Sequence, residues 1–346
     1  MESFRTQMLV CVMLILAFLP GVASAQRGSY AHVAAGSFHG MVIKKDGTLW
    51  AFGRNYVGQL GNGMYNDQHI PMQVLSNVKS VACGDTHTMA ILNDWSLYAW
   101  GENKYGQLGD GLTIDRIKPV KVLHNVKSVA CGPSHTMAIL NDGSLYAWGD
   151  NLCGQLGDGT KTNRLKPVKV LSNVKSVACG KYNTMAILND GSLYAWGSNV
   201  IGQLGDGTKT DCLKPVKILS NVKSVACGVF YTMALLNDGS LYAWGYNLYG
   251  QLGDGTKTER HTPRKVLSNV KSITCGMYHT MAILNDGSLY AWGHNNTGQL
   301  GDGTKIDRLK PVKIEDDVME VACGGFFTAY ITESGDFKTV GEIFWK

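Results

Sequence analysis

The sequence predicts an all-β protein, a seven-bladed β-propeller of four-stranded antiparallel blades in which one blade is incomplete. The first observation is a repeat of 48 residues, because the tripeptide Ala-Trp-Gly ends at Gly101, Gly149, Gly197, Gly245 and Gly293. The second is that seven copies follow one another without an insertion, which indicates a stacked or closed array. The third is that no segment has the 3.6-residue apolar period of a helix.

One unit shows why each strand is expected. Val126–Cys131 and His135–Leu140 are short runs with apolar residues on both faces, which is typical of strands buried from both sides. Asp142-Gly143 supplies the positive φ that a two-residue hairpin needs. Leu145–Trp148 is the third strand, and a long loop leads to Pro167–Leu171, the fourth, where a strand tolerates proline at its first position.

Four antiparallel strands that are buried on both faces describe a propeller blade between two neighbours. A right-handed β-helix is the alternative, but its rungs are normally shorter and need no hairpin in every unit. Seven sets of first-to-third strands occur, with only six long loops and six fourth strands. One blade should therefore lack its fourth strand, or borrow the C-terminal tail or residues 26–30. The short Leu-Ser-Asn-Val-Lys link suggests that each fourth strand pairs with the next first strand, with the long loop crossing between blades.

Two linked motifs carry a resemblance to a known family. Leu-Tyr-Ala-Trp-Gly-x-Asn-x-x-Gly-Gln-Leu-Gly-Asp-Gly, then Pro-Val, then Val-Ala-Cys-Gly-x-x-His-Thr resembles the regulator of chromosome condensation repeat, from about Val33 to Gly341. The resemblance implies a seven-bladed propeller. It implies little about activity, since that family includes a nucleotide exchange factor, signalling scaffolds and secreted β-lactamase inhibitors. The exchange factor's active loops depart from the repeat, whereas the 48-residue step is unbroken here, so nucleotide exchange is not expected.

The first 25 residues are predicted to be a cleaved secretory signal. Arg5 precedes an apolar run, Met8–Leu19, that is too short to span a bilayer comfortably, and Ala23-Ser24-Ala25 forms a cleavage site. An uncleaved membrane anchor is the alternative. Residues 26–346 then form a single propeller domain, which we expect to be a secreted or otherwise extracytoplasmic monomer. No later segment is apolar enough to span a membrane.

Charge and cysteine spacing exclude several classes of function. The net charge is +5, with lysines scattered singly through the repeats, which predicts a solvated surface and no nucleic-acid partner. Equivalent positions in facing sheets lie about 10 Å apart, beyond the roughly 7 Å between Cα atoms that a disulfide allows. We therefore expect small buried residues, without disulfides, at Cys83, Cys131, Cys179, Cys227, Cys275 and Cys323.

The residue types that could perform chemistry are repeated, which argues against an active site. A Cys-x-x-x-His spacing occurs in three repeats and could form a metal ring, but other copies carry Asn183, Tyr231 and Phe327 at the histidine position. The Asp-Gly pairs lack the alternating carboxylates of a calcium loop. An active site needs one unique constellation. We therefore predict no catalytic residue, no metal and no cofactor.

The repeats differ mainly in two loops, one after Cys-Gly and one around the fixed Asn after Trp-Gly. Because adjacent strands are antiparallel, both loops should lie at one end of the propeller, with the constant Asn-Asp-Gly-Ser turns at the other. Exposed aromatic residues with an arginine are typical of protein-binding hot spots. Our candidates for partner binding are Phe38, Arg54, Tyr56, Tyr105, Lys181, Tyr182, Phe230, Tyr231, Tyr246, Tyr249, Tyr278, His294, Phe326 and Phe327.

We therefore expect a secreted, non-enzymatic propeller scaffold that binds a protein partner. The first alternative is a carbohydrate-binding, lectin-like propeller with rings stacked on sugars, although sugar sites would tend to recur and the aromatics shift position between repeats. A hydrolase or lyase at the channel mouth is a third hypothesis. It also stays open whether about half of the rings fold inward and cap the core. Trp95, which replaces a turn glycine, should be strained at positive φ.

Overall fold

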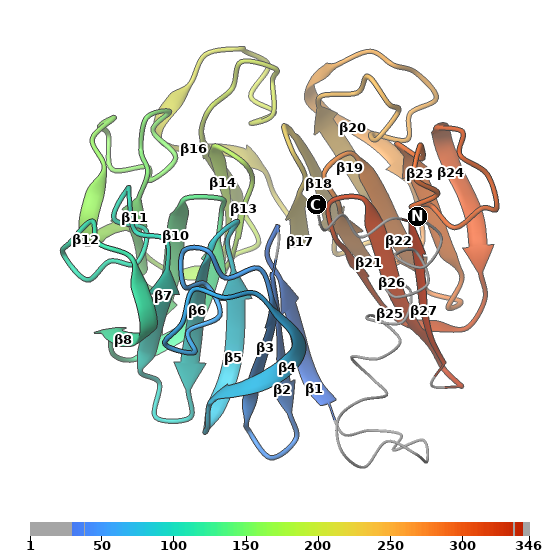
Figure 1. The fold of residues 1–346 in the computed structure, drawn as a ribbon. Helices are drawn as coiled ribbons and strands as arrows, with labels where there is room; N and C mark the ends of the chain where they lie inside the picture. Colours follow the sequence, from blue (N-terminus) through green and yellow to red (C-terminus); the bar gives the residue numbers. More distant parts are fainter. Residues whose placement is uncertain (1–29, 38, 335, 342–346) are drawn as a thin grey trace.

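The computed structural model describes residues 30–37, 39–334 and 336–341. These residues form 27 strands in seven antiparallel sheets and no helix, and the sheets stand around a central axis in chain order (Figure 1). The seven-bladed propeller is confirmed. The expected signal, residues 1–25, lies outside the described residues, as do Phe38 and the tail 342–346.

Each blade takes its strands from one repeat, and blades 1 to 7 begin at β1, β5, β9, β13, β17, β21 and β25. First strands are β1 (Tyr30–Ala35), β5 (Val78–Cys83), β9 (Val126–Cys131), β13 (Val174–Cys179), β17 (Val222–Cys227), β21 (Val270–Cys275) and β25 (Val318–Cys323). Second strands are β2 (His39–Lys44), β6 (His87–Leu92), β10 (His135–Leu140), β14 (Asn183–Leu188), β18 (Tyr231–Leu236), β22 (His279–Leu284) and β26 (Phe327–Thr332).

The outer half of each blade follows the same order. Third strands are β3 (Leu49–Gly53), β7 (Leu97–Gly101), β11 (Leu145–Gly149), β15 (Leu193–Gly197), β19 (Leu241–Gly245), β23 (Leu289–Gly293) and β27 (Phe337–Gly341). Fourth strands are β4 (Gln68–Leu75), β8 (Arg116–Leu123), β12 (Arg164–Leu171), β16 (Cys212–Leu219), β20 (Arg260–Leu267) and β24 (Arg308–Glu315). Blade 7 has three strands among the described residues, as the count of repeats predicted.

The expected pairing of each fourth strand with the next first strand is wrong. Every four-stranded sheet has the order first, second, third, fourth, and neighbouring first strands pack together around the axis. The link between blades turns sharply because Asn125 adopts a left-handed φ of 59°. Backbone hydrogen bonds from Val126 to Trp95 and from Asn141 to Asn125 then hold the link between the turns of two blades. The link therefore connects the fourth strand, at the outer edge of one blade, to the first strand of the next blade. The long loop connects the third and fourth strands of a single blade.

The fourth strands also begin earlier than the proline that was expected to start them. In β12 the pairing with β11 begins at Arg164, opposite Gly149, and shifts register before Val168. Because this strand is the outer edge of its sheet, Pro167 removes no backbone donor that a further strand would need.

The hydrophobic core lies between adjacent blades, and among the described residues it is repeated at the six junctions from blades 1 and 2 to blades 6 and 7. Between blades 2 and 3 it includes Met89, Ile91 and Leu97 from one blade and Ala138 and Trp148 from the next, all fully buried. At each of these cores, a backbone carbonyl in the long loop of the preceding blade acts as a hydrogen-bond acceptor. The carbonyl oxygen of Gln107 in blade 2 accepts hydrogen bonds of 2.9 Å from Thr136 Oγ1 and Trp148 Nε1 in blade 3. These bonds satisfy the polar atoms that a large buried indole introduces.

The ring has one weak junction, between blades 7 and 1. Neighbouring first strands pack closely at the other six junctions, whereas the described residues of β25 and β1 barely approach one another. Elsewhere a histidine often bridges to a threonine of the next blade, as His87 Nε2 does to Thr136 Oγ1 at 3.1 Å. At the weak junction the equivalent residues are Phe327 and Gly40, so neither partner can make this bond.

Candidate functional site

Both variable loops lie at one end of the propeller, which we name the variable face. In blades 2 to 6 the backbone joins the two loops of the blade; in blade 2 the N–H of Glu102 donates to the carbonyl of Thr86 at 3.0 Å. The same bond links Tyr246 to Phe230 at 2.9 Å in blade 5. The constant turns lie at the opposite end, where Val126 N–H bonds to the Trp95 carbonyl. The variable face is therefore a rigid platform whose side chains differ from blade to blade.

Contacting aromatic rings gather over one part of this face. Between Tyr249 and Tyr278 the ring centroids are 5.3 Å apart, and between Tyr249 and His294 they are 4.4 Å apart. Tyr182 and Phe230 form a second contact at 6.4 Å. These distances and tilted orientations are typical of stabilising aromatic pairs. We name the group the aromatic arc; its members are Tyr182, Phe230, Tyr246, Tyr249, Tyr278, His294 and Phe326, from blades 4 to 7.

Four ionisable rings of the arc, those of Tyr182, Tyr246, Tyr278 and His294, have pKa values shifted toward the neutral form. Burial raises the pKa values of Tyr182, Tyr246 and Tyr278 above the ordinary tyrosine value. Burial also lowers the pKa of His294, although Asp307 acts against that shift, and Gln299 Nε2 lies 3.1 Å from His294 Nδ1. A cation adjoins one end of the arc, since Lys181 Nζ lies 5.4 and 5.5 Å from the ring centroids of Tyr182 and Phe230. The arc is thus apolar and hydroxyl-bearing, with a positive charge beside Tyr182 and Phe230.

Phe230 adopts a backbone conformation that is costly for a large side chain. Its φ is 63°, in the left-handed region that non-glycine residues rarely adopt. Among the described residues it alone has positive φ at its position in the repeat. Phe230 lies on the variable face in contact with Tyr182, while Tyr231, the next residue, is buried in the core. Strain of this kind is concentrated at functional sites, which makes Phe230 a candidate in its own right.

The other part of the variable face is polar. In blade 2, Thr86 Oγ1 donates to Glu102 at 2.5 Å, and Asp85 accepts a 2.5 Å hydrogen bond from Ser37 of blade 1. Thr86 and Ser134 occupy the loop position that holds Tyr182, Phe230, Tyr278 and Phe326 in blades 4 to 7. Tyr56 and Tyr105 are the aromatic side chains of this part, and Lys104 Nζ lies 5.5 Å from the ring of Tyr105. The two parts of the variable face therefore have the same backbone structure but side chains of different chemistry.

Two sequence candidates do not belong to the variable face. Tyr231 is 1% exposed, and its hydroxyl donates to the carbonyl of His279 at 2.6 Å in the next blade. It occupies the place of the bridging histidine, so its selection as a surface residue was wrong. Phe327 has the same place in blade 7 and lies against Gly324. The remaining candidates outside the arc are Arg54, Tyr56, Tyr105 and Lys181.

The sequence analysis missed three aliphatic side chains beside the arc. Leu152, Val200 and Leu248 directly follow the fixed Asn of their loops, and each is more than half exposed. The signal was present, because this position varies from repeat to repeat. It was missed because only aromatic and charged residues were selected. Together with the rings they widen the apolar part of the variable face.

The repeated histidines are structural. Burial lowers the pKa of His135 to about 3 and that of His87 to about 4, so both are neutral, and Nε2 of each faces a threonine hydroxyl. The cysteines are free and half-buried, and burial raises the pKa of Cys83 to about 12. In the described part of the chain no three histidine, cysteine or carboxylate side chains are arranged to hold a metal ion. Nor does any helix there have the length and apolarity to cross a membrane.

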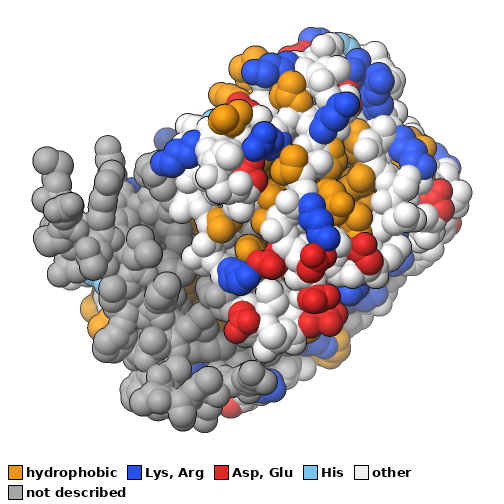
Figure 2. Space-filling model, turned by 90° about the vertical axis from the view of Figure 1, so that its right-hand side faces the viewer, with side chains coloured by type: hydrophobic (Ala, Val, Ile, Leu, Met, Phe, Trp, Pro, Cys, Tyr) orange, Lys and Arg blue, Asp and Glu red, His pale blue; other side chains and the backbone are white. Residues whose placement is uncertain are grey.

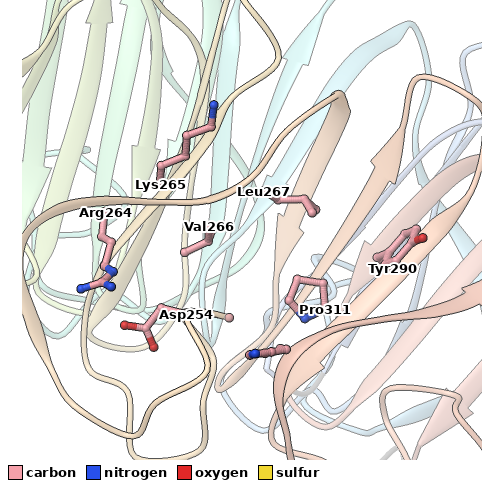
Figure 3. Close-up of a pocket in the computed structure, with 9 residues that line it drawn as sticks. Asp254, Arg264, Lys265, Val266, Leu267, Tyr290 and Pro311 are labelled. Atoms are coloured by element: carbon pink, nitrogen blue, oxygen red, sulfur yellow. The ribbon is translucent and has the colours of Figure 1, made fainter.

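A hollow on the side of the propeller offers little chemistry. Figure 2 shows the side that lies to the right in Figure 1, where apolar side chains gather among basic and acidic ones. A hollow of about 380 Å³ lies between β20 and the outer strands of blade 6, with Val266, Leu267 and Pro311 around it (Figure 3). Its carboxylate, Asp254, is already paired with Arg260 at 2.6 Å.

Comparisons with protein families identify the fold. The model of the RCC1-like domain matches residues 113–330, and two models of the regulator of chromosome condensation (RCC1) repeat match residues 46–91 and residues 30–59 and 78–107. The chain belongs to the RCC1-like domain family. A comparison with curated proteins found no match.

Similar solved structures agree with the family. Human WBSCR16 is 26% identical, with a TM-score of 0.77 over 87% of this chain and 86% of that chain. Yeast RCC1 (Prp20) bound to Kap60 is 24% identical, with a TM-score of 0.76 over 90% and 80%. Prp20p of Saccharomyces cerevisiae, described with its binding to Gsp1p and histones, is 24% identical, with a TM-score of 0.75 over 92% and 83%. At these identities the yeast structures support the fold alone.

Proposed function

We propose that this protein is a secreted, non-enzymatic propeller scaffold that binds a protein partner through the aromatic arc. The observation that carries the proposal is that, among the described residues, contacting rings are confined to blades 4 to 7, on a fold whose other contacts repeat from blade to blade. A yeast protein of the same fold is described in complex with Kap60 and as binding Gsp1p and histones, and we propose a protein as the class of partner here as well. Export is supported by the leader-like sequence of residues 1–25.

The arc has the physical properties of a binding hot spot. Tyrosine rings supply large contact areas with few rotatable bonds, so their ordering costs little free energy on binding. Tyr249 contacts Tyr246, Tyr278 and His294 before any partner arrives, which reduces that cost further. Exposed Leu248 and Val200 extend the contact surface. The partner should therefore present an apolar surface with hydrogen-bond acceptors for the tyrosine hydroxyls.

Replacing Tyr249 by Ala tests the proposal. We expect Tyr249→Ala to weaken partner binding by 10- to 100-fold, because hot-spot aromatics typically contribute about 2 kcal/mol or more. Tyr105→Ala is the matched control, since Tyr105 has the same place in the repeat of blade 2, outside the arc. The partner is captured with the full chain from the surrounding medium, and its affinity is measured by calorimetry. Sequencing of the exported protein should find Gln26 at its N-terminus.

Three outcomes would contradict this function. Equal weakening by Tyr249→Ala and Tyr105→Ala would remove the distinction between the two parts of the face. A fall in melting temperature specific to Tyr249→Ala, with affinity unchanged, would show that the rings cap the core. Binding to a glycan array that depends on Tyr249, without a protein partner, would support the carbohydrate-binding alternative.

A further inference from the structure

Each first strand carries a β-bulge at its second residue. In β9 the ladder with β10 joins Val126 to Leu140 and Ser128 to Ile139, so Lys127 has no partner in the ladder. The register shifts at the same position in the other six first strands. A bulge leaves its extra residue unpaired and can re-aim the side chain. Val126 is accordingly buried between blades, whereas Lys127 is exposed to solvent.

Five of these bulges carry an exposed lysine, and the radial order of the strands brings the five lysines together. First strands are innermost, so residues one repeat apart in the sequence lie beside one another around the axis. Lys223 Nζ reaches the carbonyl of Lys271 in the next blade at 3.3 Å. The lysines lie at the end of the propeller that has the constant turns, opposite the aromatic arc, because Val174 N–H bonds to the Gly143 carbonyl at 2.9 Å. We name the group the lysine crescent; its members are Lys79, Lys127, Lys175, Lys223 and Lys271, from blades 2 to 6.

The lysine crescent has no carboxylate of its own among the described residues. Lys127, Lys175 and Lys271 make no side-chain ion pair or hydrogen bond with any described residue. At one end of the crescent, Lys79 Nζ lies 3.1 Å from the ring centroid of Trp95, a contact that keeps the positive charge. Trp95 has the positive φ that its place in the repeat predicted, 64°. Like charges are thus gathered around the axis without counter-charges, which leaves a net attraction for anions.

Exposed aspartates stand outside the crescent, in the turns between second and third strands, and they face other lysines. In blade 3 the Ser144 N–H lowers the pKa of Asp142, and Lys169 on the outer strand β12 adds to the shift. In blade 4 the Ser192 N–H and then Lys217 on β16 act on Asp190 in the same way. The uncompensated positive charge is therefore confined to the inner strands. Such a boundary fits a small ligand, because a long polyanion would have to cross the surrounding acids.

We propose that the lysine crescent binds a small polyanion that carries several phosphate or sulfate groups. A lysine ammonium contacts such a group as a flexible point charge. Several ammonium groups around one axis can contact several groups of one ligand at once, an advantage that a single phosphate lacks. Blade 7 limits the site, because Met319 takes the place of the lysine and Glu320 follows it where blades 2 to 6 have serine. The ligand therefore lies over blades 2 to 6.

Three probes test the proposal on the full chain: myo-inositol hexakisphosphate, sucrose octasulfate and inorganic phosphate. We expect calorimetry at low salt to show saturable binding of one of the two polyanions. It should bind at least about tenfold more tightly than inorganic phosphate, because several contacts form together. Added salt should weaken the binding, since the lysines are exposed and their charges are screened. The tighter of the two polyanions identifies phosphate or sulfate as the group that the site takes.

A loss variant, a matched control and a gain variant locate the binding. The crescent variant replaces three members by glutamine: Lys127→Gln, Lys175→Gln and Lys223→Gln. The control makes the same change on the outer strands of the same blades, where the lysines face the turn aspartates: Lys169→Gln, Lys217→Gln and Lys265→Gln. We expect the crescent variant to weaken binding at least about tenfold and the control less than about twofold. Met319→Lys, at a bulge residue that is 56% exposed, should tighten binding about two- to fivefold by adding a further ammonium group.

Every other result would overturn the proposal. If neither polyanion binds more tightly than inorganic phosphate, the lysines act singly. Equal weakening by the crescent and control variants would show a response to overall charge, and an unchanged affinity of Met319→Lys would place the ligand elsewhere. The crescent variant should melt no lower than the wild type at low salt, because it loses like-charge repulsion, and a lower melting temperature would assign the lysines to stability. Tyr249→Ala should leave polyanion binding unchanged, since the aromatic arc lies at the other end, so failure here is distinguishable from failure of the proposed function.

Discussion

The junction between blades 2 and 3 and the junction between blades 7 and 1 come from one repeat but are held together differently. At the first, His87 lies 3.1 Å from the Thr136 hydroxyl, which donates to the Gln107 carbonyl at 2.9 Å together with the Trp148 indole. At the second, the described residues of blade 7 contain no long loop to supply that carbonyl. The corresponding residues are Phe327, Gly40 and Phe52, none of which has a polar side-chain group.

The comparison shows that the polar contacts of a junction are lost together: where the loop carbonyl is missing, the histidine, the threonine and the tryptophan are replaced as well. A threonine or an indole buried without an acceptor would carry an unsatisfied polar group, which costs free energy. The Phe52 ring instead fills the place where a side chain on Gly40 would stand, 2.3 Å from that Cβ position. The junction between blades 4 and 5 is an exception, because it lacks the bridging histidine but keeps the threonine to which the histidine would bond. Asn183 replaces a bridging histidine, and its Nδ2 is buried without a hydrogen bond.

The largest expected effect compares a covered glycine with an uncovered one. Gly250→Asn should destabilise the protein by about 3 kcal/mol, because the new Cβ would lie 2.7 Å from the backbone of Leu309 in the next blade. Gly298→Asn, at the same place in the long loop of blade 6, should cost less than about 1 kcal/mol, since among the described residues no atom lies closer than 3.8 Å to the added Cβ. Urea unfolding measures both. Equal losses would mean that the last loop is covered after all.

The bridging histidines predict a loss of stability in acid. The pKa of His135 is about 3 in the fold, against about 6.5 when unfolded, so the unfolded chain binds a proton that the native state does not. Its contribution to stability is complete above about pH 6.5 and is lost as the pH falls toward 3. At pH 5 one such histidine costs about 2 kcal/mol. His135→Asn, which copies Asn183, should therefore lose about 2 kcal/mol less than the wild type between pH 7.5 and pH 5.

The control for this prediction is His124→Asn, at an exposed position in the link between blades 2 and 3. It should follow the wild-type curve in urea unfolding at both pH values. A His135→Asn curve that is parallel to the wild type would show that the buried ring gains its proton in the native state as well.

The period and the bounds of the first and second strands could be predicted because every repeat carries the same information. The radial order of the strands could not. A link of two residues such as His124-Asn125 is compatible with a hairpin and with a crossing between blades. The crossing is shown by backbone hydrogen bonds to the turns of both blades, from Val126 N–H to the Trp95 carbonyl and from Asn141 N–H to the Asn125 carbonyl. The start of β12 at Arg164 was also missed, because the tolerance of an edge strand for an internal proline depends on knowing which strand is the edge.

The candidate site could be predicted as a face but not as a set of contacts. Phe230 and Tyr231 are neighbours with similar side chains, and the sequence analysis placed both on the surface. In the structure Tyr231 takes the buried place of the bridging histidine, where its hydroxyl finds a backbone acceptor in the next blade, while Phe230 takes the loop position that Tyr278 holds in blade 6. Composition does not reveal which residue of such a pair turns outward. The clustering of rings over blades 4 to 7 likewise depends on distances between loops that are 48 residues apart.

The smallest expected effect concerns the incomplete ion pair of blade 4. In blade 3 Arg164 lies 2.6 Å from Asp158, whereas in blade 4 Asp206 faces Cys212 Sγ at 3.6 Å. Burial and then the Asp206 carboxylate raise the pKa of the Cys212 thiol to about 11, so it stays neutral. Cys212→Arg should restore the pair and stabilise the protein by about 0.5–1 kcal/mol at low salt, with a smaller gain at high salt. Cys212→Ala is the control, and equal stability of the two variants in urea would show that the repeated Asp–Arg pair contributes nothing to holding its loop.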